Sequence, residues 1–130
     1  MLIDDDDVTL LICELRLKAS KFCEEIIKMD DGADALAFFE NQLTLAPNER
    51  TLPELIFLDI NMPITNGWEF LDEFEKKYQS TFGNIPIAVL SSTIDPVDTD
   101  RAANHELVLG FISKPLTEAS LVRLGKSGIF

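Results

Sequence analysis

The chain has 130 residues, the usual length of one domain, so we expect residues 1–130 to form a single domain with its own core. Its formal net charge of −12 argues against nucleic acid as a partner, because surfaces that bind phosphate backbones are basic. We find no apolar segment long enough for a membrane and no secretory signal pattern. Cys13 and Cys23 match no metal or redox spacing, so we expect buried thiols in a protein of the reducing cytoplasm.

The first predicted elements are a short strand at residues 2–3 and a helix behind it. The apolar residues that recur at helical spacing here are Val8, Leu11, Ile12 and Leu15. This stripe predicts a helix that begins near Asp7, with Asp7 or Thr9 at its amino end.

Strands and helices are then predicted to alternate along the rest of the chain. In order, we expect a strand at 25–29, a helix at 33–42, a loop at 45–53, a strand at 55–58, a helix after Gly67, a strand at 85–90, a helix at 95–104, a strand at 110–113 and a helix at 117–124. This alternation favours crossover connections and a parallel sheet.

Polar residues follow four of the predicted strands, at the point where each strand ends. Four aspartates, Asp4 to Asp7, follow the first strand, and Asp59 follows the apolar run at 55–58. Ser91 comes after the strand at 85–90, and Lys114 precedes a proline after the last strand. The carboxyl ends of parallel strands meet at one edge of the sheet, where open α/β folds bind ligands. We therefore expect these side chains to converge.

This set of strand ends resembles the receiver domain of two-component response regulators. The segments LDINMP (58–63), GWEFL (67–71) and FISKPL (111–116) are similar to those of stand-alone receivers, and the resemblance covers nearly the whole chain. It implies an α/β, flavodoxin-like fold: a doubly wound, five-stranded parallel sheet in three α/β/α layers. The strand order 2-1-3-4-5 is carried over from that fold.

The resemblance also implies a chemistry for Asp59. A sensor histidine kinase or a histidine phosphotransfer protein would donate a phosphoryl group to this carboxylate, which acts as a nucleophile and forms an acyl phosphate. Ser91 and Lys114 would contact the phosphoryl oxygens. The peptide bond between Lys114 and Pro115 would be cis. The domain would catalyse its own phosphorylation and dephosphorylation, as a signalling module more than a metabolic enzyme.

Carboxylates at one sheet edge repel each other unless a cation lies among them, and hard oxygen ligands suit Mg²⁺. We expect Asp4, Asp5 and Asp59 as ligands, because Asp4 and Asp5 directly follow the first strand. The resemblance adds the backbone carbonyl of Asn61. The pair Asp5/Asp6 remains an alternative, although a solvated turn explains Asp6 more simply.

The resemblance further implies a switch. Ser91 and the aromatic Phe111 would couple phosphorylation to a face formed by residues 95–104 and 117–124, which would bind a downstream protein that the sequence does not identify. One alternative is a receiver-like interaction module that works without phosphorylation. Another is a haloacid-dehalogenase-type phosphohydrolase, but that chemistry needs a second aspartate where this chain has Asn61.

Overall fold

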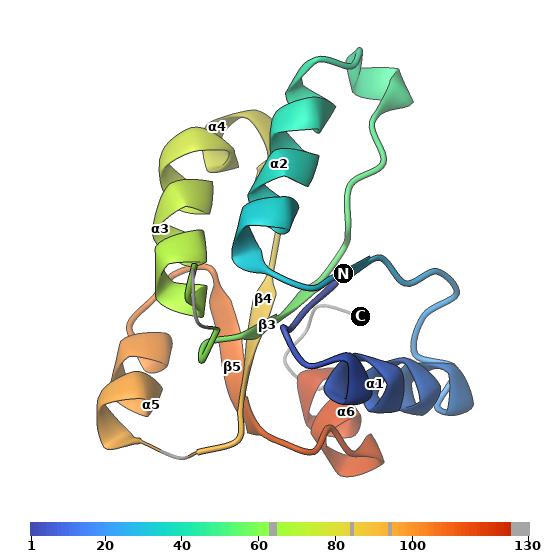
Figure 1. Cartoon of the computed structure of the whole chain (residues 1–130), viewed down its shortest axis with the longest axis vertical. Helices are drawn as coiled ribbons and strands as arrows, with labels where there is room; N and C mark the ends of the chain where they lie inside the picture. The colour runs from blue at the N-terminus through green and yellow to red at the C-terminus, as the bar shows by residue number, and fades with distance from the viewer. Residues whose placement is uncertain (63–64, 84, 94, 126–130) are drawn as a thin grey trace.

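Five parallel strands form the central sheet of the computed structural model, which describes residues 1–62, 65–83, 85–93 and 95–125 (Figure 1). The strands are β1 (Leu2–Ile3), β2 (Lys28–Met29), β3 (Ile56–Asp59), β4 (Ile87–Ser91) and β5 (Val108–Ser113). Their order is β2-β1-β3-β4-β5, and each neighbouring pair is parallel. The predicted flavodoxin-like fold and its strand order are therefore confirmed. The predicted single domain includes residues 126–130, which lie outside the described residues.

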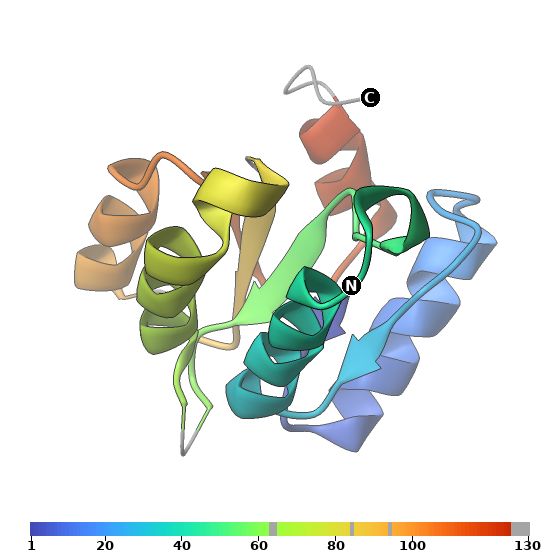
Figure 2. The same cartoon turned by 90° about the horizontal axis from the view of Figure 1, so that it is seen from above.

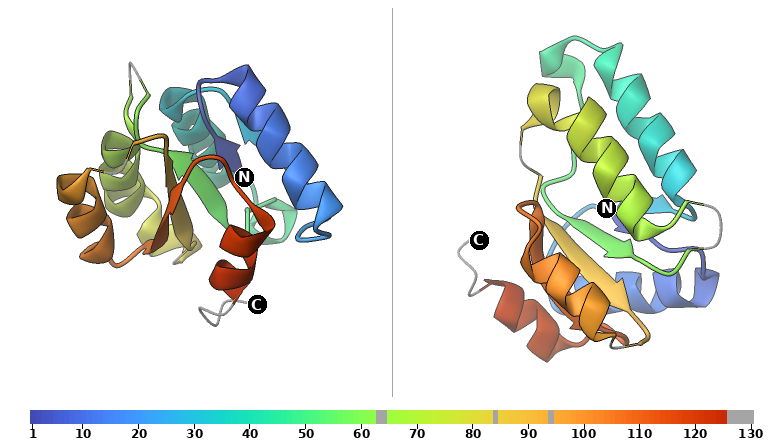
Figure 3. Two further views of the ribbon diagram at one scale, coloured as in Figure 1. Left: turned by 90° about the horizontal axis from the view of Figure 1, so that it is seen from below. Right: turned by 90° about the vertical axis from the view of Figure 1, so that its left-hand side faces the viewer.

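Helices cover both faces of this sheet (Figures 2 and 3). On one face lie α1 (Asp7–Ala19) and α6 (Glu118–Leu124), and on the other lie α2 (Gly32–Leu43), α3 (Gly67–Lys77) and α5 (Pro96–Ala103). Two short elements, η1 (Pro47–Glu49) and α4 (Gln79–Phe82), connect helices to the next strands. In the described part of the chain, no helix combines the length and the apolar character needed to span a bilayer.

Successive strand residues point to opposite faces and build two separate cores. Ile56 and Leu58 pack beneath α2 and α3, where Phe39 meets Phe74 edge to face at a centroid distance of 5.0 Å. Phe57, between them in sequence, packs beneath α1 and α6. Both faces of β3 are thus buried, which is why its sequence is a continuous apolar run. The two cores hold the carboxyl ends of β1, β3, β4 and β5 at one edge of the sheet.

The helix predicted to begin near Asp7 is confirmed as α1, but its apolar stripe does not face the core. Val8, Leu11, Ile12 and Leu15 are between 44% and 63% exposed, whereas Leu10, Cys13 and Leu17 face the core. The helix carries apolar residues on two sides, so periodicity alone could not choose between them. The capping residue also differs from the prediction. It is Asp6, which accepts hydrogen bonds from the Val8 N–H at 3.0 Å and the Thr9 hydroxyl at 2.9 Å.

Other element boundaries differ for reasons of pairing. The second strand was expected at 25–29 but includes only Lys28 and Met29, because its neighbour β1 offers just Leu2 and Ile3 as partners. The last strand starts at Val108 rather than Gly110, since Val108 pairs with Ile87 before an irregularity in register. The short helix α4 was not predicted. It ends at Gly83, whose φ of 77° suits glycine.

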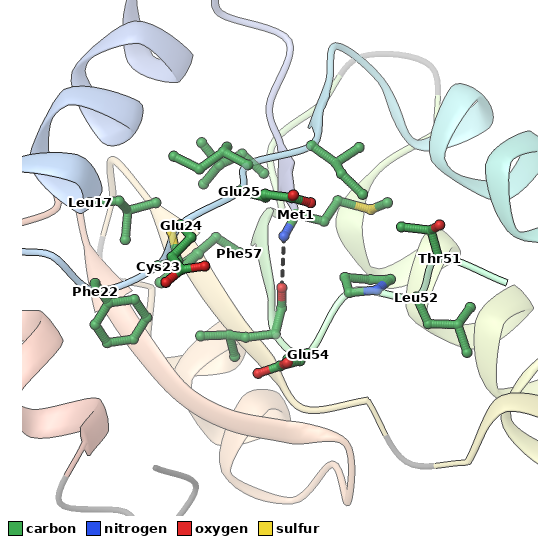
Figure 4. A pocket seen from close by; sticks show the side chains of 15 residues that line it. Met1, Leu17, Phe22, Cys23, Glu24, Glu25, Thr51, Leu52, Glu54 and Phe57 are labelled. Carbon is green, nitrogen blue, oxygen red and sulfur yellow. Dashed lines mark hydrogen bonds between the residues drawn. The ribbon is translucent and has the colours of Figure 1, made fainter. Parts of the chain in front are cut away.

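A cavity of about 450 Å³ lies at the amino ends of β1 and β3 (Figure 4). The amino group of Met1 donates a hydrogen bond to the Leu55 carbonyl there at 2.8 Å, between Phe22 on one side and Leu52 on the other. The polar residues that end the strands lie at the opposite edge of the sheet. The cavity is therefore separate from the candidate site described below.

Candidate functional site

Asp59 is the last residue of β3, and its position depends on close packing behind it. Its side chain is nearly inaccessible, at 3% exposed for the whole residue. The Ile60 N–H donates to the Leu90 carbonyl at 3.3 Å, which extends the pairing past the strand end. The first residue of α3, Gly67, lies so near that a Cβ there would be 2.6 Å from Ile60 Cα and 2.8 Å from the Asp59 carbonyl oxygen. Only glycine allows α3 to begin this close to the strand.

Three carboxylates converge at this edge, namely those of Asp4, Asp5 and Asp59, which we call the strand-end carboxylates. One oxygen from each lies within 4.8 Å of the others. Asp4 is buried at 2% exposed, while Asp5 is exposed. Asp6 points elsewhere, into the cap of α1, although its N–H donates to Asp4 Oδ1 at 3.0 Å. The geometry therefore favours Asp4 and Asp5 over the alternative pair Asp5/Asp6.

Lys114 brings positive charge to the same place from the end of β5. Its Nζ lies 2.7 Å from Asp4 Oδ2 and 3.5 Å from Asp59 Oδ1. Its backbone N–H donates to the Ser91 carbonyl at 2.7 Å, and the bond to Pro115 is cis. Burial alone would lower the pKa of the ammonium, but the hydrogen bond to Asp4 and the charge of Asp59 raise it above the ordinary value. Lys114 therefore stays charged at neutral pH.

The Asp59 carboxyl has a pKa above the ordinary value of 3.8. Burial is the main cause, because it disfavours the charged form, and the nearby charge of Asp4 adds to the effect. The hydrogen bond from the Asn61 N–H at 3.0 Å and the charge of Lys114 act in the opposite direction. The ionised form of Asp59 is therefore energetically unfavourable in the metal-free site, because one ammonium is shared between two buried carboxylates.

Ser91 ends β4, and its hydroxyl group is fixed by hydrogen bonds to Thr93 and Asn61. Its hydroxyl donates to the Thr93 carbonyl at 2.7 Å and accepts from the Thr93 N–H at 3.1 Å. The side-chain amide of Asn61 donates to the same oxygen at 3.0 Å, a hydrogen bond that the sequence did not predict. Asn61 therefore connects the Asp59 loop to the hydroxyl. Its carbonyl as a metal ligand stays a prediction.

The residues at this edge fit a hard divalent cation. Asp4 Oδ2 is buried, and its one partner among the described residues is the Lys114 ammonium, 2.7 Å away. Two buried carboxylates share this single ammonium, so the site keeps an excess of negative charge that a bound divalent cation would offset. The donor set is all oxygen, as Mg²⁺ prefers.

Phe111 lies on β5 and packs, half-buried, against the core beneath α2 and α3. Its predicted coupling to Ser91 is not tested by this geometry and stays a prediction. A contact that the sequence did not predict joins two helices beside the site: the indole N–H of Trp68 donates to Asp98 Oδ1 at 3.1 Å. The two residues are thirty positions apart in sequence, and no local pattern pairs them.

Known proteins resemble the chain over most of its length. The family model of the response regulator receiver domain matches residues 1–124. The chain belongs to this family. The receiver domain is 32% identical over 107 residues to response regulator Rcp1 of Synechocystis, which covers 82% of this chain and 69% of Rcp1.

Solved structures agree with this assignment. A two-component response regulator from Cytophaga hutchinsonii is 32% identical, with a TM-score of 0.85 over 96% of the receiver domain and 91% of that chain. The phosphorylated cyanobacterial phytochrome response regulator RcpA is 27% identical, with a TM-score of 0.71 over 96% and 84% of the two chains. This receiver domain is therefore a signalling domain of the two-component response regulator type.

Proposed function

We propose that Asp59 is the phosphoacceptor of this receiver domain. The observation that carries the proposal is the position of a buried carboxylate at a strand end, with the Lys114 ammonium 3.5 Å from its Oδ1 and two further carboxylates beside it. Such a constellation has little structural value, because it concentrates like charges that burial makes costly. A phosphoryl-transfer site needs this combination of a nucleophile, a cation and ligands for a metal.

In the proposed reaction, an Asp59 carboxylate oxygen attacks the phosphorus of a phosphohistidine. A new O–P bond forms while the N–P bond breaks, and the electron pair of that bond returns to the imidazole. Lys114 stabilises the negative charge of the phosphoryl oxygens. The same site then hydrolyses the acyl phosphate with water, which is the self-dephosphorylation expected of the domain. Mg²⁺, held by Asp4, Asp5, Asp59 and the carbonyl of Asn61, would neutralise charge during transfer.

The phosphodonor would be a sensor histidine kinase or a histidine phosphotransfer protein. The exposed residues of α1 offer it a docking surface, made of Val8, Leu11, Ile12 and Leu15. This helix starts directly behind the strand-end carboxylates, so a donor that reaches Asp59 passes over its first turns. Exposed apolar side chains gathered on one helix face are characteristic of protein-binding surfaces.

Phosphorylation would then change the surroundings of Ser91. Its hydroxyl has a single proton, which it now donates to the Thr93 carbonyl. To donate to a phosphoryl oxygen instead, it must give up that bond and turn toward Asp59. We infer that this movement, together with Phe111, presents an altered face of α5 and α6 to a downstream protein.

Intact-mass spectrometry tests the phosphoacceptor directly. Incubation with a small phosphodonor such as phosphoramidate and Mg²⁺ should add one phosphate that is stable in acid and labile in base. The Asp59→Asn variant should stay unmodified. An unchanged mass for the wild type, under conditions that label another receiver, would instead favour an interaction module that works without phosphorylation.

A further inference from the structure

Helix α5 buries few of its side chains, although it packs against β5 through Ala102. All eight of its residues are described, and only Ala102 is buried, while Val97 is 72% exposed. Other helices, such as α3 with five buried residues, are anchored by apolar side chains. With so little apolar burial, polar contacts to neighbouring elements contribute a larger share to the position of α5 than to that of α3.

These contacts converge on Trp68, at the start of α3, which lies beside α5 (Figure 1). The indole N–H donates to Asp98 Oδ1 at 3.1 Å, and the Arg101 guanidinium lies over the ring, 4.6 Å from its centroid. Asp98 and Arg101 are three residues apart and so share one face of the helix. Arg101 also reaches Asp72, one turn further along α3, at 3.8 Å.

The same helix follows directly from the Ser91 turn. Ser91 is bonded to Thr93, and Asp95 caps the start of α5 two residues later. A Ser91 side chain that turns toward Asp59 would pull on the segment that leads into α5. On the side of Asp59, Trp68 directly follows Gly67, which is packed against the Asp59 carbonyl. The hydrogen bond between Trp68 and Asp98 thus joins the two helices that follow the strands carrying Asp59 and Ser91.

We propose that Trp68 and Asp98 form a clasp that holds α5, and through it the Ser91 turn, in the arrangement of the unphosphorylated domain. The proposal rests on the proposed function of Asp59 and adds two positioning residues to it. Neither residue touches the phosphoryl group. The clasp opposes the movement of Ser91, so opening it should make the phosphorylated arrangement easier to reach.

Three variants separate the clasp from general effects on α5. Asp98→Ala removes the acceptor. Asp98→Asn keeps an acceptor oxygen at the same place and removes only the charge. Asp100→Ala removes the same charge from an exposed position of the same helix, where no clasp contact is lost. Circular dichroism establishes that each variant is folded.

Two readouts use Mg²⁺ with beryllofluoride as a stand-in for the phosphoryl group. Because the chain has one tryptophan, its indole N–H gives one resonance in a ¹⁵N-correlated NMR spectrum. In the wild type this resonance should move, on binding of the mimic, toward its position in Asp98→Ala. By calorimetry, Asp98→Ala should bind the mimic about fivefold more tightly than the wild type, the effect of one net hydrogen bond. Asp98→Asn and Asp100→Ala should match the wild type.

The two possible failures give different results. If the mimic binds but the indole resonance stays in place and all four affinities agree, the clasp is overturned while the function of Asp59 stands. If Asp98→Asn behaves like Asp98→Ala, charge rather than the hydrogen bond sets the position of α5, and the clasp is again overturned. If the wild type binds no mimic, the proposed function fails and the clasp fails with it.

Discussion

Two groups of three aspartates in this domain have similar spacing and different surroundings. The strand-end carboxylates are those of Asp4, Asp5 and Asp59. A second group, which we call the helix-end carboxylates, is formed by Asp30, Asp31 and Asp34. In both groups, one oxygen from each residue lies within 4.8 Å of the others. Proximity of carboxylates therefore does not by itself distinguish a metal site.

Burial and partners distinguish the two groups. Asp4 and Asp59 are almost inaccessible, and the two carboxylates share the one ammonium of Lys114. In the helix-end group, Asp31 caps α2 by accepting from the Asp34 N–H at 2.6 Å. The pKa of Asp34 is raised by a hydrogen bond to Asp30 and by the charge of Asp31, but Asp30 and Asp34 are exposed, so water screens their charges. The helix-end group thus caps α2, whereas the strand-end group carries more negative charge than Lys114 can neutralise.

The largest expected effect comes from removing the cation of the strand-end group. Lys114→Ala leaves two buried carboxylates without a counterion, so the metal-free domain should lose roughly 3 kcal/mol of unfolding free energy in urea melts. Lys28→Ala is the control from the helix-end region, because Lys28 pairs with Glu14 at an exposed site and such pairs contribute little. Equal losses for the two variants would show that the strand-end charges are screened by water.

Stabilisation by Mg²⁺ should depend on the strand-end group and not on the helix-end group, and this effect should be almost as large. At about a hundredfold excess over the dissociation constant, it should stabilise the wild type by roughly 2.7 kcal/mol. Asp59→Asn should remove most of this gain, whereas Asp34→Asn should keep it. Thermal melts across a Mg²⁺ series provide the measurement. A gain that depends on Asp34 would move the metal site to the helix-end group.

The same variants predict a pH dependence in the absence of metal. The pKa of Asp59 is raised in the folded domain, so its ionised form costs stability at neutral pH. This cost should be relieved as pH falls through the raised pKa, and the relief should be complete below 3.8, the ordinary value. Asp59→Asn should be more stable than the wild type at pH 7 without metal, and the difference should shrink as pH falls. A difference that grows toward acid would contradict the raised pKa.

A smaller difference is expected between the two glycines that begin the helix beside each group. Gly67→Ala should cost about 2 kcal/mol, because its Cβ would be 2.6 Å from the Ile60 backbone. Gly32→Ala, at the start of α2, should cost less, since its Cβ would meet Thr65 at 3.0 Å. Urea midpoints measure both. If Gly67→Ala proves neutral, the start of α3 is not fixed against the strand that carries Asp59.

The smallest effect concerns the caps. Asp6→Ala and Asp31→Ala each remove a side chain that accepts from a helix N–H, so both should lower the melting temperature slightly. The losses should be the same with and without Mg²⁺. A loss of the Mg²⁺ response in Asp6→Ala would make Asp6 a ligand and support the pair Asp5/Asp6.

The sequence predicted where the strands end, but it did not reveal which face of α1 is buried. The positions of Asp4, Asp59, Ser91 and Lys114 could be grouped because parallel strands place their carboxyl ends together, whatever the packing of side chains. The face of α1 could not be predicted, since Leu10 and Leu11 are equally apolar and only the path from β1 decides which is buried. The roles of the strand-end residues in phosphoryl transfer stay predictions, as does the expected location of the protein in the cytoplasm.

The bonds from Asn61 to Ser91 and from Trp68 to Asp98 could not have been predicted for a different reason. Each joins loops or helices that follow different strands, at a separation of thirty residues, and neither residue pair is marked by periodicity or a local motif. Such contacts depend on side-chain positions to within an ångström, which the pattern of apolar residues does not determine.

Locating the phosphoryl group tests the account most directly. After reaction with a small phosphodonor and Mg²⁺, borohydride reduction converts an aspartyl phosphate to homoserine, which tandem mass spectrometry of peptides can assign to one residue. The account predicts homoserine at position 59 alone, in the wild type and in Asp34→Asn. Homoserine at Asp4, Asp5 or any of the helix-end carboxylates, with Asp59 unmodified, would contradict it.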